Sequence, residues 1–316
     1  MRALLSKGDG SDEAIDLRAW GSRRLSQDEL LWIDIESLDE GDLDVVRGAI
    51  RLSDDAAEAL ESEPGKPDAT VLKDAVEVIV LPLADDDTQD PAPLRILMGN
   101  GWVITRHEVP MPSLDEHRAR ITDQREVGQL TSLEFLVSLL DWHVDSFFRA
   151  AEELEAEVDD LDDAALRRDD DLLQDLVAMR RRIAKVRRIV SVHREVFAEL
   201  MRPGFLTGLE EGESNALRHL ADRLERAGEG VANVREMLIG TFDVHMTRTA
   251  QRTNDTMKIL TLASVILLPS VVVAGIMGMN FKVPIFENSS LFFVVVGFMA
   301  VMAVVTLLVA RWRHWL

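Results

Sequence analysis

Two uncharged, apolar runs near the end of this sequence constrain its fold more than any other feature. Neither Ile259 to Met277 nor Leu291 to Ala310 contains an Asp, Glu, His, Lys or Arg residue. A helix over the first run rises about 28 Å, which is close to the hydrocarbon thickness of a bilayer. We therefore predict two transmembrane helices, 259–280 and 291–311. The short segment 281–290 between them requires an antiparallel hairpin.

Basic residues flank the two predicted spans on the same side of the hairpin. They are Arg248, Arg252 and Lys258 before the first span, and Arg311 and Arg313 after the second. By the positive-inside rule, both flanks and the tail 312–316 lie in the cytoplasm. The first residues show no secretory signal. We expect a multi-pass protein of the bacterial cytoplasmic (inner) membrane, with both termini cytoplasmic and the segment 281–290 outside.

The charge and residue composition of the remaining sequence excludes several functional classes. The chain has 56 acidic and 35 basic residues, a net charge of −21, so nucleic acid is not an expected partner. It has no cysteine, which excludes disulfides, thiolate metal sites and thiol catalysis. No phosphate-binding glycine loop, His-rich metal motif or nucleophile motif occurs. We predict that the protein is not an enzyme and has no cofactor.

The first part of the chain alternates between strand and helix patterns. A turn at Gly99-Asn100-Gly101 predicts a β-hairpin from Leu94 to Thr105. Further strands are expected at Trp32–Ile35 and Ala75–Leu83, and helices at Leu43–Ile50 and Asp54–Leu60. These patterns predict a cytoplasmic α/β domain over residues 1–125.

A helical hairpin is predicted over residues 126–212. Leu130 to Leu161 and Leu172 to Met201 both carry apolar residues at helical spacing, and Asp169-Asp170-Asp171 marks the bend. The end of the first helix is acidic, and the second helix is basic. Opposite charges favour pairing of the two helices as a solvated hairpin. The acidic residues alternatively provide a surface that collects cations.

A long stalk helix is predicted to follow. Pro203-Gly204 and Gly212 break the chain, and Ser214 is a candidate N-cap. A continuous helix from Ser214 to Met279 would be about 100 Å long. Its cytoplasmic part, 213–258, is polar, while the rest is apolar. Because such a helix is not stable alone, it needs lateral partners, which favours a homo-oligomer.

One face of the first span and its approach carries small, apolar and polar residues in succession. This stripe consists of Asn254, Met257, Leu260, Ser264, Leu268, Val271, Gly275 and Gly278, and it leads to Asn280. It fits either a pore lining or an ordinary helix-packing face, since Gly and Ser are common at membrane helix contacts.

The absence of ionisable residues in both spans narrows the chemistry of a pore. Proton relays use ionisable groups at depth, and zinc is typically held by His or thiolate. Amide and backbone oxygens suit a hydrated ion such as magnesium, which gives up its water reluctantly. A ring of Asn280 side chains could accept hydrogen bonds from that water. Leu268 and Val271 could form a dewetting gate.

Three phrases carry a resemblance to a known family. They are Asn254-Asp-Thr-Met-Lys-Ile-Leu-Thr, Leu268-Pro269, and Ala274-Gly-Ile-Met-Gly-Met-Asn-Phe. The sequence resembles the CorA superfamily of divalent-cation channels and transporters, whose first membrane helix ends in Gly-Met-Asn.

The resemblance implies a funnel-shaped homopentamer in which five first helices line the pore. Gly278, Met279 and Asn280 would form the outer selectivity ring, with Asn280 contacting the ion through water. Asn254, Met257, Leu260, Leu268 and Val271 would line the conduit. Magnesium would be both substrate and possible regulator, because intracellular cations close magnesium-type members by binding acidic residues between subunits. Asp222 is a candidate for such an acid.

The sequence also departs from the magnesium-type pattern. Met277 stands where many of those members have Tyr, the phrase Met-Pro-Glu-Leu is absent from the loop, and Lys282 lies beside the entrance. The leading hypothesis is magnesium influx. One alternative is transport of zinc, nickel or cobalt, with or without proton coupling. The other is a non-conducting, membrane-anchored cation sensor.

Overall fold

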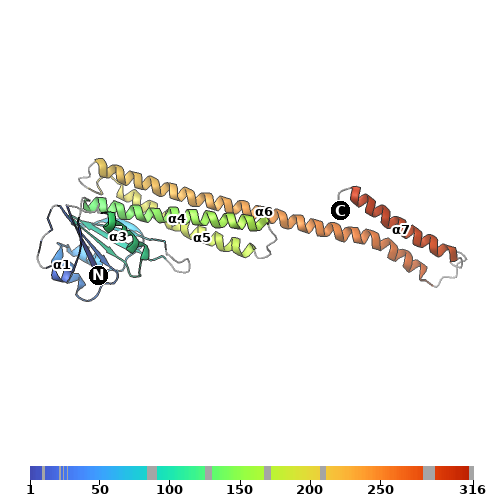
Figure 1. Cartoon of the computed structure of the whole chain (residues 1–316), viewed down its shortest axis with the longest axis horizontal. Helices are drawn as coiled ribbons and strands as arrows, with labels where there is room; N and C mark the ends of the chain where they lie inside the picture. The colour runs from blue at the N-terminus through green and yellow to red at the C-terminus, as the bar shows by residue number, and fades with distance from the viewer. Residues whose placement is uncertain are drawn as a thin grey trace. The chain divides into compact units, whose positions relative to one another are not determined.

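The computed structural model describes two compact units of the chain, Met1–Thr241 and Phe242–Leu316. Figure 1 shows both units, with the main helices labelled and the colour running along the chain. The described residues are 1–8, 11–20, 23, 25–26, 28–83, 91–124, 130–166, 172–206, 211–279 and 289–312.

A seven-stranded sheet forms the centre of the first unit, with the strand order β2-β1-β3-β7-β6-β5-β4. Neighbouring strands are antiparallel except β3 and β7, which are parallel. The strands are β1 (Arg2–Lys7), β2 (Asp12–Ile15), β3 (Glu29–Ile35), β4 (Asp68–Val71), β5 (Val76–Val80), β6 (Leu94–Gly99) and β7 (Trp102–Arg106).

The predicted hairpin at Gly99-Asn100-Gly101 is confirmed as the β6–β7 turn. Gly99 pairs with Trp102 across the two strands. Gly101 has a φ of 78°, a left-handed conformation that favours glycine. A Cβ added at Gly99 would lie 2.2 Å from the Trp102 ring. The two glycines therefore allow both the turn and the close packing of Trp102.

Helices cover both faces of the sheet. On one face, Leu31, Ile33 and Ile35 of β3 join a core that includes residues of α1 and α2. On the other face, the Trp32 ring lies 5.2 Å from the ring of Phe135 in α4. The helices of this unit include a 3-10 turn (Leu17–Ala19), α1 (Asp42–Ala49), α2 (Asp54–Glu61), α3 (Pro112–Gln124), α4 (Ser132–Leu166) and α5 (Leu172–Leu200). This arrangement confirms the predicted α/β class.

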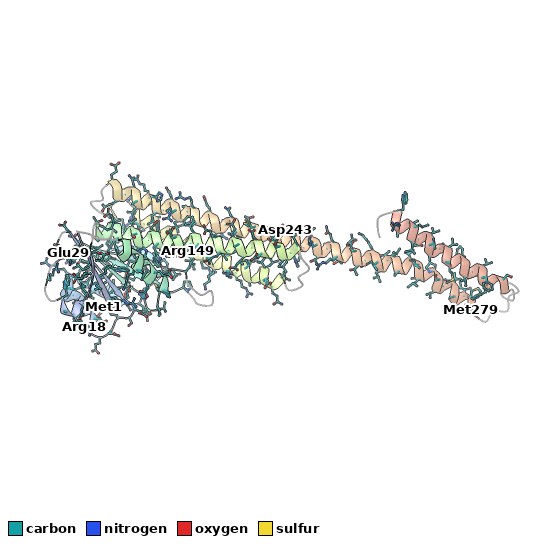
Figure 2. The ribbon with its side chains drawn as sticks, viewed as in Figure 1. Met1, Arg18, Glu29, Arg149, Asp243 and Met279 are labelled. Atoms are coloured by element: carbon teal, nitrogen blue, oxygen red, sulfur yellow. The ribbon has the colours of Figure 1, made fainter. Side chains whose placement is uncertain are left out.

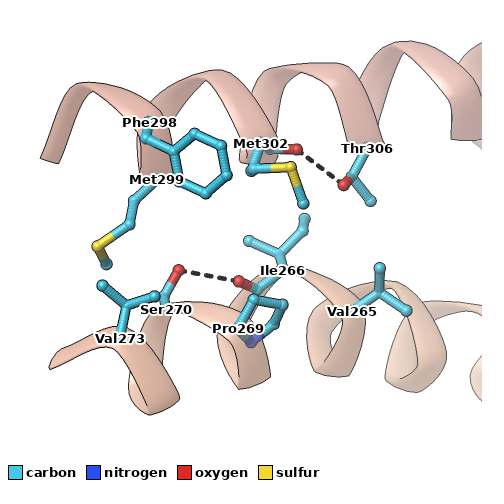
Figure 3. Close-up of a pocket in the computed structure, with 9 residues that line it drawn as sticks. All are labelled: Val265, Ile266, Pro269, Ser270, Val273, Phe298, Met299, Met302 and Thr306. Atoms are coloured by element: carbon cyan, nitrogen blue, oxygen red, sulfur yellow. Dashed lines mark hydrogen bonds between the residues drawn. The ribbon is translucent and has the colours of Figure 1, made fainter. Parts of the chain in front are cut away.

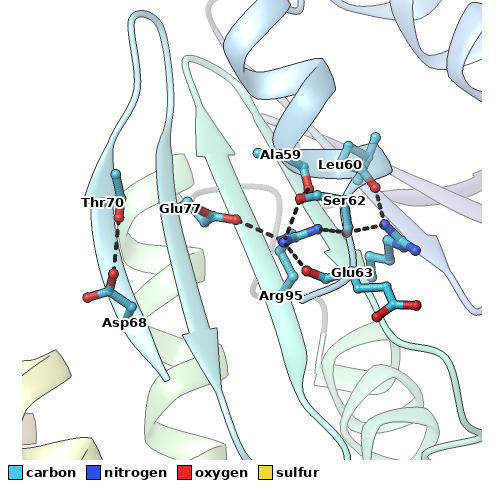
Figure 4. Close-up of polar contacts among 9 residues, drawn as sticks. Ala59, Leu60, Ser62, Glu63, Asp68, Thr70, Glu77 and Arg95 are labelled. Carbon is cyan, nitrogen blue, oxygen red and sulfur yellow. Dashed lines mark hydrogen bonds and ion pairs between the residues drawn. The ribbon is translucent and has the colours of Figure 1, made fainter. Parts of the chain in front are cut away.

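Two buried arginines hold the end of α2 against the sheet. Arg95 and Arg106 are opposite each other on β6 and β7. Arg95 Nη1 donates to the Ser62 carbonyl at 2.6 Å, and Arg106 Nη1 donates to the carbonyls of Leu60 and Ser62. Figure 4 shows the contacts of Arg95, including its ion pair with Glu77. The guanidinium groups satisfy carbonyls that the end of a helix leaves unpaired, at its partially negative terminus.

The long helix α6 (Glu211–Met277) extends from this unit into the next. Within the first unit it lies beside α4 and α5 (Figure 1). Arg223 of α6 forms ion pairs with Asp141 and Asp145 of α4. The face of α6 that packs in this unit is apolar and has helical spacing. It comprises Leu217, Leu220, Leu224, Ala227, Val231, Val234 and Leu238, all buried.

The predicted start of the stalk helix at Ser214 is wrong. The helix begins at Glu211 and includes Gly212. A glycine inside a helix costs about 1 kcal/mol relative to alanine but does not end it. Glu211 and Glu213 in the first turn offset part of that cost by facing the partially positive helix terminus.

Two buried histidines lie between α4 and α5. His143 and His193 are 1% and 0% exposed, and their rings are 4.6 Å apart. His193 accepts the Leu81 N–H at Nε2 and lies 2.6 Å from the Ile189 carbonyl through Nδ1. Neither ring nitrogen of His143 has a hydrogen-bond partner among the described residues. Burial lowers the pKa of His143 well below its usual value and that of His193 to about 4.

We predict that this pair makes the protein acid-sensitive and that His143→Leu reduces the sensitivity. Above pH 6.5 both histidines are neutral in the folded and unfolded chain. As the pH falls toward 4, the unfolded chain takes up protons that the folded chain cannot. For His193 this costs up to ~3 kcal/mol of unfolding free energy. At pH 7, His143→Leu should be at least as stable as wild type, because it removes unpaired polar atoms.

Thermal unfolding of the detergent-solubilised protein at pH 7 and pH 4.5 measures this effect. His219→Leu, at an exposed position of α6, is the matched control. Equal loss of stability in wild type and His143→Leu on acidification would contradict the prediction.

Candidate ion pathway

The second unit contains the two predicted spans. They are the end of α6 and α7 (Ser289–Trp312). Among the described residues, α6 and α7 are the helices long and apolar enough to cross a membrane. Their large apolar side chains are exposed; Leu268 is 65% exposed and Phe293 is 74% exposed. Helices satisfy their own backbone hydrogen bonds, so lipid can cover such side chains.

One face of α6 packs against α7. A cavity of about 20 Å³ lies between the two helices, with space for about one water molecule. Figure 3 shows the residues that line it. The α6 residues around it are Val265, Ile266, Pro269, Ser270 and Val273, and the α7 residues are Phe298, Met299, Met302 and Thr306.

Polar groups at this contact bond within their own helices. Ser270 Oγ donates to the Ile266 carbonyl at 3.1 Å, and Thr306 Oγ1 donates to the Met302 carbonyl at 2.8 Å. Pro269 has no N–H, so it cannot donate to the carbonyl of the preceding turn. The contact is therefore held mainly by apolar packing.

The predicted stripe lies on the opposite face of α6. At about 100° per residue, Leu268 and Val271 point away from Ile266, Ser270 and Val273. The burial pattern agrees, because the stripe residues are exposed, whereas Ile266, Ser270 and Val273 are partly covered. The exposed fractions are 56% for Met257, 61% for Leu260, 65% for Leu268 and 67% for Val271. Within one chain, the stripe is therefore not the face that packs on α7.

The N-terminal end of the stripe is more polar than its middle. Asn254 is exposed, and neighbouring Asp255 forms an ion pair with Lys258 at 2.9 Å. Ser264 Oγ donates to the Leu260 carbonyl at 2.9 Å. The pore-lining role of these residues stays a prediction.

The C-terminal end of the stripe closes with a turn. The Gly278 N–H donates to the Ala274 carbonyl at 2.9 Å, and the Met279 N–H donates to the Ile276 carbonyl at 3.3 Å. Met279, labelled in Figure 2, is the last described residue before the connecting segment. Asn280 and Lys282 lie outside the described residues. The selectivity ring therefore stays a prediction.

Asp222 is exposed on α6, in the first unit. The described residues contain no group of three or more His, Cys, Asp or Glu side chains that could hold a metal. The regulatory role of Asp222 stays a prediction.

A buried polar network of the first unit was not predicted. The Thr105 hydroxyl donates to Asp34 Oδ1 at 2.6 Å and accepts from Trp32 Nε1 at 3.0 Å. His107 Nε2 lies 3.3 Å from Asp34 Oδ1, and Arg118 forms an ion pair with Oδ2. Arg118 also lies over the Trp32 ring, 4.6 Å from its centroid.

Electrostatics explain why Asp34 stays charged in this network. Burial by itself raises the pKa of Asp34, but hydrogen bonds from His107 and Thr105 and the charge of Arg118 lower it below its usual value. The pKa of His107 is raised, because its interactions with Asp34 outweigh the effect of burial. Internal partners engage both carboxylate oxygens. The network therefore anchors α3 to the sheet and does not offer an ion site.

Comparison with known proteins agrees with this architecture. The chain is 29% identical over 206 residues to the cobalt/magnesium transport protein CorA of Thermotoga maritima, an alignment that covers 64% of this chain and 58% of that relative. The chain thus matches less than two thirds of that relative's length.

Two solved structures share the fold. The complete structure of the CorA magnesium transporter from Methanocaldococcus jannaschii has a TM-score of 0.83 at 22% identity, covering 100% of this chain and 99% of that one. The cytoplasmic domain of ZntB from Vibrio parahaemolyticus has a TM-score of 0.62 at 12% identity, covering 79% and 98%. The full-length match confirms the predicted order of an α/β domain, a long helix and two apolar C-terminal helices.

A family model described as CorA-like Mg2+ transporter protein matches residues 27–312. Because that match covers most of the sequence, the resemblance to the CorA family is confirmed, and the chain belongs to the family of CorA-like Mg2+ transporter proteins.

Proposed function

We propose that this protein carries divalent cations across a membrane through a homopentameric pore lined by the stripe face of α6. One observation carries the proposal: the stripe lies on the face of α6 that α7 leaves uncovered. A simple membrane anchor of two helices needs only the face on which the helices contact each other. On α6 the stripe forms a second, opposite face, which other copies of the chain can cover around a central pathway.

Magnesium, transported as a hydrated ion, is the leading substrate. The spans have no ionisable side chain to replace the water of an ion or to relay protons. Amide and backbone oxygens can bind the water shell that magnesium keeps. The Thermotoga relative is named for both cobalt and magnesium.

Transport of cobalt, nickel or zinc is the second candidate. Met277 and Lys282 depart from the magnesium-type pattern, and Lys282 adds a positive charge beside the entrance. A sensor that does not conduct is the third. In every case we place both termini in the cytoplasm, because basic residues flank the spans. Closure of the pore by intracellular magnesium, with Asp222 as one binding acid, belongs to the magnesium candidate.

The first test is Asn280→Ala in purified protein reconstituted into liposomes. Loss of the amide ring should lower magnesium flux on the order of tenfold, or change the ratio of magnesium to cobalt, nickel and zinc flux. Oligomer assembly should be retained. Asn215→Ala, an exposed asparagine at the other end of α6, is the matched control. Unchanged flux and selectivity would reject the asparagine ring, and absent wild-type flux of all four ions would favour the sensor.

The second test maps the two faces of α6 by cysteine modification, because the chain has no cysteine of its own. Leu268→Cys and Val271→Cys should react with a charged, water-soluble thiol reagent roughly tenfold faster than Ile266→Cys and Val273→Cys, since charged reagents avoid apolar contacts. Modification at the stripe should also block flux. Equal reactivity on both faces would place the pathway elsewhere.

A further inference from the structure

The helices α4 and α5 each expose a face with charges of one sign. The acidic face of α4 consists of Glu152, Glu153, Glu155, Asp159 and Asp160, and the basic face of α5 consists of Arg180, Arg181, Arg187 and Arg188. All nine side chains are exposed. Each face extends over nine consecutive positions, about 12 Å of helix.

The two faces cannot neutralise each other within one chain. Leu154 and Val158 of α4, and Ile183 and Val186 of α5, are buried on the inner sides of these helices. The ion pair between Glu157 and Arg182 lies at the contact of the two helices. In the described part of the chain, no ion pair involves a member of either face.

Each face alone is electrostatically unfavourable. Glu155 and Asp159 are four residues apart, a spacing at which like charges on a helix repel. A partner of opposite charge would relieve the repulsion on both helices.

The two faces lie level with each other along the helices. The helices are antiparallel, and Glu157 contacts Arg182. Asp159 is therefore level with Arg180, and Glu152 is level with Arg187. Rotation about an axis parallel to the helices keeps every residue at its height. Such a rotation can bring the acidic face of one copy level with the basic face of the next, and repeating it closes a ring.

We propose that the acidic face of α4 docks on the basic face of α5 in the neighbouring copy. This interface rests on the homo-oligomer of the proposed function and adds to it a water-exposed contact outside the membrane. It pairs Asp159 of one copy with Arg180 of the next, and Glu152 with Arg187. Because these charges are exposed, salt weakens the interface.

Disulfide cross-linking of the full-length protein tests this pairing. Two differently tagged copies, one with Asp159→Cys and one with Arg180→Cys, are co-expressed and mildly oxidised in membranes. The mixed cross-link should form, and its yield should fall in high salt. Co-expression of two differently tagged Asp159→Cys copies is the matched control and should give about tenfold less product, since those positions do not meet.

Charge exchange tests whether the pairing stabilises the oligomer. Reversal of Arg180, Arg187 and Arg188 to Glu should weaken oligomer association on the order of tenfold, equivalent to about 1.4 kcal/mol. Combining it with Glu152→Lys, Glu155→Lys and Asp159→Lys should restore association. Circular dichroism of each variant verifies that the helices are intact.

Failure of this interface can be told apart from failure of the proposed function. An intact wild-type oligomer that conducts ions but gives no mixed cross-link would overturn the interface alone. Restoration that fails although both charge variants fold would do the same. A monomeric wild-type protein would overturn the homo-oligomeric pore and the interface together.

Discussion

The helix α6 must remain helical in two different solvents, and the other features of the chain follow from this constraint. Helix propensity alone stabilises a helix weakly, so packing must stabilise its 67 residues. In the first unit, side chains such as Leu224 and Val231 supply that packing by burial. In the second unit α7 covers one face, and Leu268 and Val271 stay exposed on the other. Lipid or further copies of the chain must cover that face. The stripe residues Gly275, Gly278 and Ser264 are small enough for close helix contact, which favours further copies.

The absence of ionisable groups in the spans has both a structural and a chemical meaning. A charged group there would need a partner or water, and two helices provide little of either. Hydroxyls such as Ser270 and Thr306 instead bond to carbonyls of their own helices. A pathway lined in this way would contact a hydrated ion through the ion's own water and through amide and backbone oxygens, without a charged side chain. Membership in a family of transporters also confirms the prediction that the chain is not an enzyme.

Local sequence patterns predicted the helices, strands and turns that are determined by residues close together in the sequence. The glycines around Asn100 specified the β6–β7 turn, and helical periodicity identified α4, α5 and the stripe. The sequence patterns missed three strands. β1 lies inside the sheet, whereas β2 and β4 lie at its two edges. These two are short and carry charged residues, as edge strands often do, so they lack the apolar alternation of a buried strand. The Asp34 network was missed because its members are distant in sequence. The parallel pairing of β3 with β7 brings Asp34 beside Thr105, and no local pattern encodes that pairing.

The same limit applies to the proposed pathway, because its lining would come from more than one copy of the chain. The helical period of α6 determines which side chains share the stripe, but a single chain does not determine what faces them. The charged faces of α4 and α5 lie in water, so ionic strength would control the attraction between neighbouring copies there. Contacts between copies along the stripe would instead involve apolar and small side chains, which salt hardly affects. In an oligomer held by both kinds of contact, salt can therefore weaken the contacts between the charged faces of α4 and α5 without separating the membrane-spanning helices. Ionic strength should then change the mobility of α4 and α5 more than the association of the spans.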